Sequence, residues 1–176
     1  MHDHVQRALD ALDRTTGGLA VEALGLRPRD KWSIAEILEH LTLAYTRNAA
    51  GFAKVVETGQ PRATAPTFKQ RLARTLVVDV AFFPRVRAPE PTTPTGSIPA
   101  DRIRESARAA LVALDLAMDR AEARFGVELP LVSHPYFAGM NIRQWRKFHW
   151  RHTVHHMKQV SAICATPASS RSPAAS

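Results

Sequence analysis

Cysteine is nearly absent from this sequence, because Cys164 is the single cysteine among 176 residues. One thiol excludes an intrachain disulfide and a metal site built from several thiolates. The N-terminal stretch MHDHVQRALDALDR carries charges throughout and lacks the continuous apolar segment of a secretory signal. We therefore expect a cytoplasmic protein in which Cys164, near the negative end of a predicted helix, is structural or incidental.

Long hydrophobic runs are also missing. The longest apolar run, 76–83, is interrupted by Asp79 and is far too short to span a bilayer. Strand patterns are scarce as well, because no alternating run of β-branched residues continues beyond a few positions and no hairpin dipeptide separates two such runs. We therefore expect no membrane partner and a helical fold.

Acidic residues are few relative to basic ones. The chain has 24 Lys and Arg but only 16 Asp and Glu, which gives a net charge of +8. Such a surface attracts anions, but this alone does not distinguish nucleic acid, anionic lipid and a small acidic substrate. The arginines are scattered rather than gathered in one run with interleaved aromatic residues, as a platform for single strands would require. We expect no nucleic-acid partner. A protein that binds anions through its arginines remains one possible functional class.

Apolar residues recur at helical spacing in four segments. The clearest start signal is Ser33 with Glu36, a capping-box pair ahead of a long helix that closes at Gly59. Asn141 with Gln144 offers a similar pair before the last segment. Five prolines between positions 84 and 99 predict a long irregular crossover. The four predicted helices cover a short segment before Gly17, the segment 34–59, the segment 100–125 and the segment 142–165.

These elements predict an all-α fold, a four-helix bundle with a long crossover connection. We expect residues 1–165 to form one domain and the small, polar segment 166–176 to be a disordered C-terminal tail. Seven apolar residues are expected to share the core: Trp145, Phe148, Ile163, Leu41, Tyr45, Leu111 and Leu114.

The last predicted helix contains four of the eight histidines, in the stretch FHWRHTVHHMKQV. At 100° per residue, His152 and His156 lie about 20° to either side of the centre of the apolar face, whereas His155 is turned away by about 80°. Two imidazoles spaced by four residues can bind one metal ion together. The alternative is a pair of buried histidines that only form hydrogen bonds within the core.

A third ligand would have to come from another helix. His40 lies at the edge of the apolar arc of the second predicted helix, so a modest rotation would turn it inward. Three histidines with an open fourth position are one arrangement of a catalytic metal site, and imidazole suits zinc, nickel, copper and iron. Glu36 could accept a hydrogen bond from His40, although its capping role explains it better, and His149 is expected at the rim of the site or in solvent.

Three segments carry a family resemblance: WSIAEILEHL, HPYFAGMNIRQW and the HxxHxxHHxxQ pattern of His149 to Gln159. They resemble the DinB/YfiT-like superfamily of four-helix bundles, and more closely an uncharacterised DinB-related branch with HP, Gly, Trp and an HxxHHxxQ ending. The resemblance implies a mononuclear zinc or nickel ion held by one histidine of the second helix and an HxxxH pair of the last. Position by position, these ligands are His40, His152 and His156.

The resemblance also implies a function. Members of this superfamily are described as metal-dependent hydrolases or as transferases of thiols such as mycothiol, bacillithiol or glutathione, and some have lost the metal. We therefore expect a small-molecule substrate. Gln159, about one turn beyond His156 on the same face, could orient the substrate or an imidazole, and the alternative is an amide at the edge of the core that is bonded to the backbone. The alternative is a metal-free helical-bundle module for interaction or stress response, which could act as a homodimer.

Overall fold

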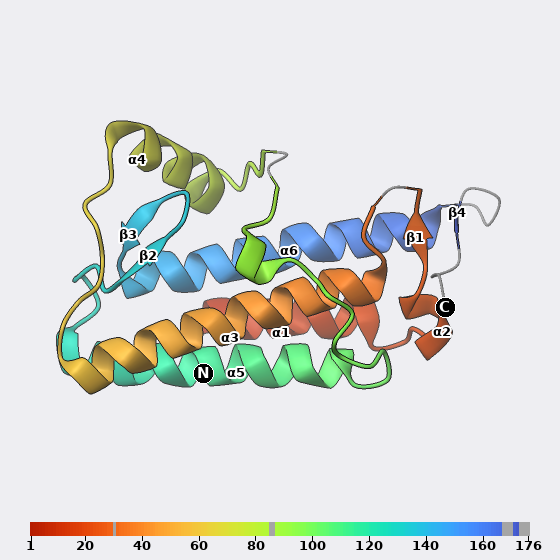
Figure 1. Ribbon diagram of the computed structural model, residues 1–176, viewed down its shortest axis with the longest axis horizontal. Coiled ribbons are helices and arrows are strands. Elements are labelled where there is room, and N and C mark those ends of the chain that lie inside the picture. Colours follow the sequence, from red (N-terminus) through yellow and green to blue (C-terminus); the bar gives the residue numbers. More distant parts are fainter. Residues whose placement is uncertain (30, 85–86, 167–170, 173–176) are drawn as a thin grey trace.

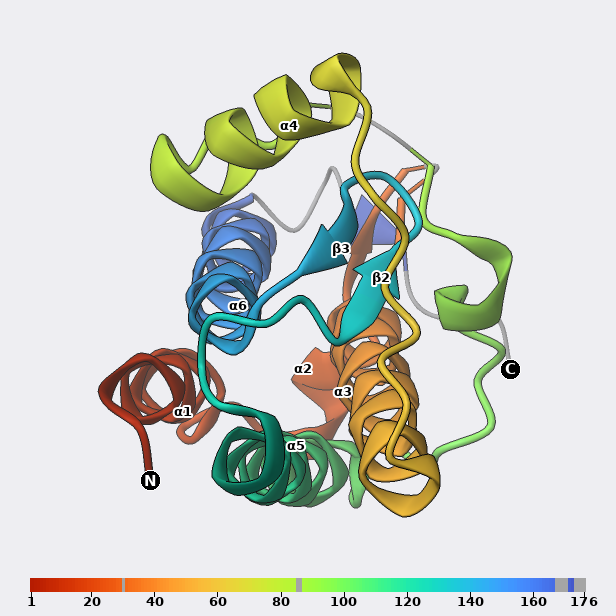
Figure 2. The same cartoon turned by 90° about the vertical axis from the view of Figure 1, so that its left-hand side faces the viewer.

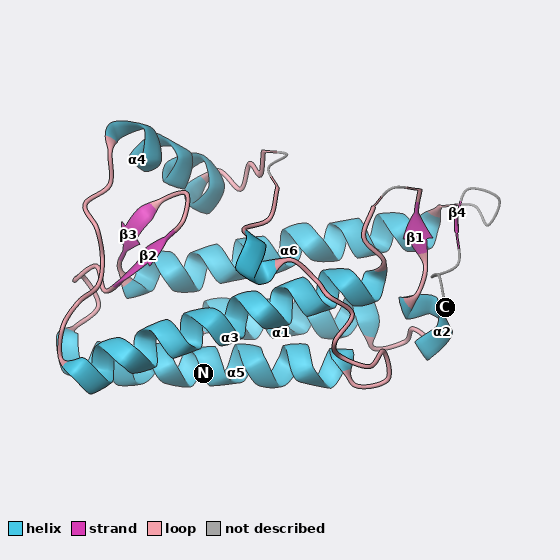
Figure 3. Cartoon of the chain, in the orientation of Figure 1, coloured by secondary structure: helices cyan, strands magenta, loops and turns pink. Residues whose placement is uncertain are grey.

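The computed structural model describes residues 1–29, 31–84, 87–166 and 171–172. Helices dominate these residues, so the all-α prediction is confirmed (Figure 3). The four long helices are α1 (Asp3–Thr16), α3 (Ile34–Thr58), α5 (Ile103–Phe125) and α6 (Ile142–Ala165). The short helical elements are α2 (Val21–Leu24), α4 (Phe68–Arg74), the π-helical turn η1 (Thr75–Asp79) and the 3-10 turn η2 (Glu90–Thr92) (Figure 1).

Two small antiparallel pairs complete the structure. β1 (Arg27–Pro28) pairs with β4 (Arg171–Ser172), and β2 (Val132–His134) pairs with β3 (Ala138–Met140). The β2–β3 hairpin is fastened to α6 because the Trp145 indole N–H donates to the Val132 carbonyl at 3.2 Å. The tail predicted for 166–176 lies outside the described residues except for Thr166, which ends α6, and the two residues of β4.

The end-on view shows the four long helices arranged around a common interior (Figure 2). Their buried apolar side chains form one core there. The most extensive packing joins α3 with α5 and α1 with α6, and contacts of α1 with α5 and of α3 with α6 close the ring. Each of the seven residues predicted for the core is at most 5% exposed, which confirms that prediction. Among the described residues, no helix has the length and apolar content needed to cross a membrane.

Both predicted capping boxes are present at the helices that carry the histidines. Ser33 and Glu36 exchange side-chain and backbone hydrogen bonds at the start of α3, and Asn141 and Gln144 do the same for α6. α3 ends at Gly59, whose φ of 70° lies in the left-handed region that glycine adopts without a steric penalty. Local sequence signals therefore determine where the histidine-bearing helices begin and where α3 ends.

The crossover between α4 and α5 is tied to α3 by Glu39, which is only 2% exposed. Its carboxylate accepts hydrogen bonds from the Gly96 N–H at 2.8 Å and from the Ser97 N–H at 3.0 Å, as well as from the hydroxyls of Ser97 and Thr95. Burial alone would raise the pKa of Glu39, but these hydrogen bonds hold it below its ordinary value. Glu39, which directly precedes His40 in the sequence, thus anchors the crossover to α3.

Candidate metal centre

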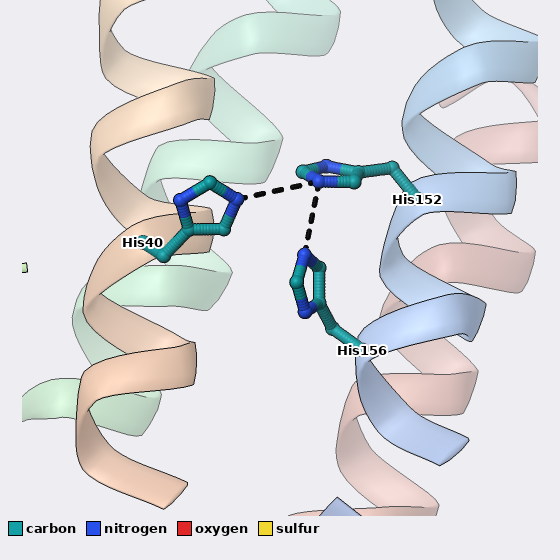
Figure 4. A group of neighbouring side chains, drawn as sticks. All are labelled: His40, His152 and His156. Atoms are coloured by element: carbon teal, nitrogen blue, oxygen red, sulfur yellow. Dashed lines mark hydrogen bonds between the residues drawn. The ribbon is translucent and has the colours of Figure 1, made fainter. Parts of the chain in front are cut away.

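Three histidines from two helices meet between α3 and α6 (Figure 4). The Nε2 atom of His152 lies 3.3 Å from Nε2 of His40 and 3.0 Å from Nε2 of His156. One ligand atom from each ring lies within 4.8 Å of the others, so the three side chains could hold a metal ion. These are the three residues predicted from the sequence, and the tertiary structure brings all of them together.

The spacing of the nitrogens suits a small divalent ion. A tetrahedral ion with metal–nitrogen distances of about 2.0 to 2.1 Å places its ligand nitrogens about 3.3 Å apart. The His40–His152 separation of 3.3 Å equals that edge, and the His152–His156 separation of 3.0 Å is slightly shorter. These two separations are compatible with one ion shared by the three rings.

The outer nitrogens of two rings are already engaged by acceptors. Nδ1 of His40 lies 2.7 Å from the Thr92 carbonyl oxygen, and Nδ1 of His156 lies 2.8 Å from Oε1 of Gln159. Each of these oxygens can only accept, so Nδ1 of each ring carries the proton and Nε2 presents a lone pair. The other end of the Gln159 amide donates to Nε2 of His155 at 3.2 Å. Thr92 and Gln159 therefore hold two rings in the tautomer that a metal requires.

His152 stands between these two lone pairs and has no good hydrogen-bonding choice of its own. Its Nδ1 atom is buried without a hydrogen-bond partner among the described residues. If Nε2 of His152 carries the proton, it can satisfy His40 or His156 but not both. If Nδ1 carries it, three lone pairs face one another. A cation at the centre would relieve the repulsion between the three Nε2 lone pairs.

Burial keeps the three rings neutral. It lowers the pKa of His152 well below the ordinary value, and the neighbouring His156 and His40 lower it further. Burial lowers the pKa of His156 to about 3 and also lowers that of His40, where the hydrogen bond to Thr92 opposes it in part. Neutral imidazole is the form that binds a metal, so the cluster is competent at neutral pH.

Aromatic side chains enclose the cluster. Trp32 packs on His40 with ring centroids 5.1 Å apart, and Phe148 stacks on His152 at 5.2 Å. Phe83, from the start of the crossover, stacks on His155 at 4.6 Å and lies 6.1 Å from His152. In the part of the chain that the structure describes, no carboxylate forms a hydrogen bond with any of the three ligand candidates.

Comparison with known proteins places the chain in a family. A family model described as "Protein of unknown function (DUF1569)" matches residues 3–162, a span that includes all three histidines. The chain belongs to the DUF1569 family. No curated protein and no solved structure matches it.

Sequence reasoning misplaced His149 of this DUF1569 protein, whereas the capping role that it preferred for Glu36 is confirmed. His149, expected at the rim or in solvent, is completely buried, with Nε2 accepting from the Asn48 amide at 3.3 Å. Glu36 does not contact His40, because its carboxylate accepts from the Ser33 N–H at 2.6 Å and from Arg27 at 3.0 Å. The acceptor for His40 is the Thr92 carbonyl, which lies in the crossover and left no signal in the sequence.

His155 lies outside the cluster, as its angle on the helix predicted. Its ring is half-buried beside Phe83, and it accepts a hydrogen bond from Gln159. Gln159 was expected to orient a substrate or an imidazole. Its hydrogen bond with Nδ1 of His156 corresponds to the orientation of an imidazole. The DUF1569 chain thus supplies three candidate ligands and two groups that orient them.

Acid should destabilise the DUF1569 fold through histidines outside the cluster. Burial lowers the pKa of His149 to about 3 and that of His134 to about 4, from 6.5. Below pH 6.5 the unfolded chain takes up protons that the folded chain excludes, so the free energy of unfolding falls as pH falls. At about pH 5 each group accounts for a loss of about 2 kcal/mol.

Urea unfolding at neutral pH and at about pH 5 measures this loss. We expect the midpoint to fall steeply with an unchanged slope against urea concentration, because the same surface is exposed on unfolding. An unfolding free energy that stays constant over this interval would contradict the burial of neutral His134 and His149.

Proposed function

We propose that this chain is a DinB-like four-helix bundle that binds one divalent ion through His40, His152 and His156 and acts as an enzyme on a small-molecule substrate. The observation that carries the proposal is the convergence of the Nε2 atoms of two buried histidines, His40 and His156, with that of the partly buried His152. The Nε2 atoms of His40 and His156 are held as lone pairs by acceptors at Nδ1. The family resemblance of the sequence selects the same three residues. Zinc and nickel are the ions that the three-imidazole donor set and this resemblance favour.

A bound divalent ion would lower the pKa of a coordinated water or thiol and so supply a nucleophile at neutral pH. The protein's own part is to hold the rings and to shape their surroundings. The Thr92 carbonyl and Gln159 keep two imidazoles in the binding tautomer. Phe83, Phe148 and Trp32 surround the rings with apolar surface, which restricts water and strengthens electrostatic interactions at the centre.

Two reactions fit such a centre: hydrolysis of a small substrate and transfer of a low-molecular-weight thiol. No carboxylate forms a hydrogen bond with the three rings within the described residues, so no acidic general base is tied to the cluster. A thiol needs less help, because coordination to a metal deprotonates it outright. This difference favours thiol transfer, and hydrolysis is the second candidate.

Elemental analysis of protein purified without a polyhistidine tag tests the proposal. After incubation with zinc or nickel and removal of free metal, we expect one ion per chain. The matched control is a variant with all three histidines replaced by Ala, which should retain no stoichiometric metal. The loaded protein is then assayed with glutathione and chlorodinitrobenzene for thiol transfer and with a nitrophenyl ester for hydrolysis. Absence of stoichiometric metal in the parent would overturn the proposal in favour of the metal-free interaction module.

Gln159 should tune metal affinity without being a ligand. Gln159→Leu removes the acceptor from Nδ1 of His156, so the ring loses its fixed tautomer and some basicity, and we expect metal affinity to fall about 10- to 100-fold. Competition with a chromophoric chelator measures the dissociation constant. The exposed neighbour Lys158 provides the control, because Lys158→Leu should leave the affinity unchanged. Equal affinities of the two variants would mean that Gln159 has no part in orienting His156.

A further inference from the structure

The segment formed by α4, η1 and the three residues that follow presents an uncovered apolar stripe. Of the ten large hydrophobic side chains that are exposed in the described chain, five fall within residues 68–82. Four of them are spaced by four residues and so share one side of the helical segment. The stripe consists of Phe68 (81% exposed), Leu72 (53%), Leu76 (39%), Val80 (64%) and Phe82 (59%).

The outward orientation of the stripe is determined by contacts on the opposite side of the same segment. Val77 and Val78 of η1 are buried, and η1 packs on α6. Asp79 pairs with Lys147 of α6 at 2.6 Å, and the Arg74 guanidinium donates to the Gly139 carbonyl at 3.2 Å. α4 itself has no buried residue and lies on the outside of the molecule (Figure 2). The stripe is therefore a defined surface on a well-anchored segment.

Positive charge accompanies the stripe. Residues 59–84 contain four basic side chains, Arg62, Lys69, Arg71 and Arg74, and a single acidic one, Asp79. That acid is already paired with Lys147. Lys69 and Arg71 are exposed on α4 and form no ion pair with the described residues. An apolar face next to unneutralised Lys and Arg is typical of helices that lie in the interface of an anionic membrane.

We propose that the stripe docks on an anionic lipid surface, with its apolar side chains inserted among the acyl chains and Lys69 and Arg71 at the headgroups. The positive charges beside the stripe favour an anionic lipid surface over a second copy of the chain. Two copies joined through the stripe would bring like charges together without an acidic residue to pair with them, whereas anionic headgroups complement the charges. The expectation of no membrane partner rested on the lack of a spanning segment, and interfacial docking does not require one.

Vesicle co-sedimentation of the full chain tests the proposal. The probes are vesicles of phosphatidylcholine alone and vesicles of phosphatidylcholine with about one quarter phosphatidylglycerol, at low and high salt. We expect binding to the anionic vesicles, weakened by salt. Phe68→Ser with Leu72→Ser should weaken it by about ten-fold or more, because two apolar side chains no longer leave water on binding.

Two matched controls separate the stripe from the rest of the surface. Leu116→Ser with Leu129→Ser changes two exposed apolar residues outside it, and should bind like the parent. Lys69→Glu with Arg71→Glu should abolish binding, whereas Arg47→Glu with Arg120→Glu makes the same change of net charge elsewhere and should reduce it much less. All of these side chains are exposed, so melting temperatures should match the parent.

Several outcomes would overturn the proposal. These are binding to neither kind of vesicle, equal binding to both kinds, and equal losses in the stripe variants and their controls. Sedimentation velocity provides the remaining one. A dimer that is lost only in Phe68→Ser with Leu72→Ser, without vesicle binding, would assign the stripe to a second copy of the chain.

Discussion

Replacing His40, His152 or His156 by Ala is expected to lower the affinity for zinc or nickel by more than about a hundred-fold, because one lost ligand of three is not easily replaced by water. Isothermal titration and elemental analysis measure the loss. His155→Ala is the matched control, since this ring lies on the same helix but outside the cluster, and it should retain the ion. Equal metal loss from His155→Ala would contradict the assignment of ligands.

A second variant separates a metal site from a polar core. His152→Leu removes the ring whose Nε2 faces two lone pairs and whose Nδ1 is buried without a partner among the described residues. In metal-free protein we expect this change to be neutral or stabilising, since an unsatisfied buried polar group costs about 1 to 3 kcal/mol. With zinc present, the same variant should be less stable than the parent, which alone gains from binding. A hydrogen-bonded histidine network would instead make His152→Leu destabilising without metal.

Arg146→Ala should be among the most destabilising single changes in the chain, at about 3 to 5 kcal/mol. The Arg146 side chain of α6 is 4% exposed and pairs with three carboxylates of α5, from Asp115, Asp119 and Glu122. Asp115 is itself 3% exposed, and its Oδ2 atom accepts a hydrogen bond from the backbone N–H of His2. Removal of Arg146 leaves Asp115 buried without its cation, and the cost is the desolvation of that charge.

Arg143→Ala is the control for this prediction. Arg143 lies one turn earlier on α6 and pairs with Glu128, but both side chains of that pair are about two thirds exposed. Exposed pairs contribute between about 0 and 1 kcal/mol, so Arg143→Ala should hardly change the urea midpoint. Arg146→Met combined with Asp115→Leu should recover much of the stability, because it removes the buried charge together with its partner. Similar losses in Arg146→Ala and Arg143→Ala would contradict the buried network.

Local sequence patterns were enough to predict the long helices and to place two of the three candidate ligands on one face of the last helix. The capping pairs Ser33–Glu36 and Asn141–Gln144 mark where α3 and α6 begin, because they satisfy backbone groups only a few residues away. The angle between successive residues of a helix places His152 and His156 on one face and turns His155 away, whatever the rest of the chain does. The choice of His40 as third ligand came from family resemblance, because helical periodicity cannot say how two helices face each other.

Contacts between distant segments decided the rest. The acceptor for His40 is the Thr92 carbonyl, 52 positions along the chain, and every residue has such a carbonyl, so side-chain identity carries no signal for it. Arg146, counted among scattered surface arginines, is buried because α5 brings three carboxylates to it. Within 68–82, Val77 and Val78 are buried, whereas the five apolar residues of the stripe are exposed. Whether an apolar face is buried depends on whether another element covers it, and only the tertiary structure determines that.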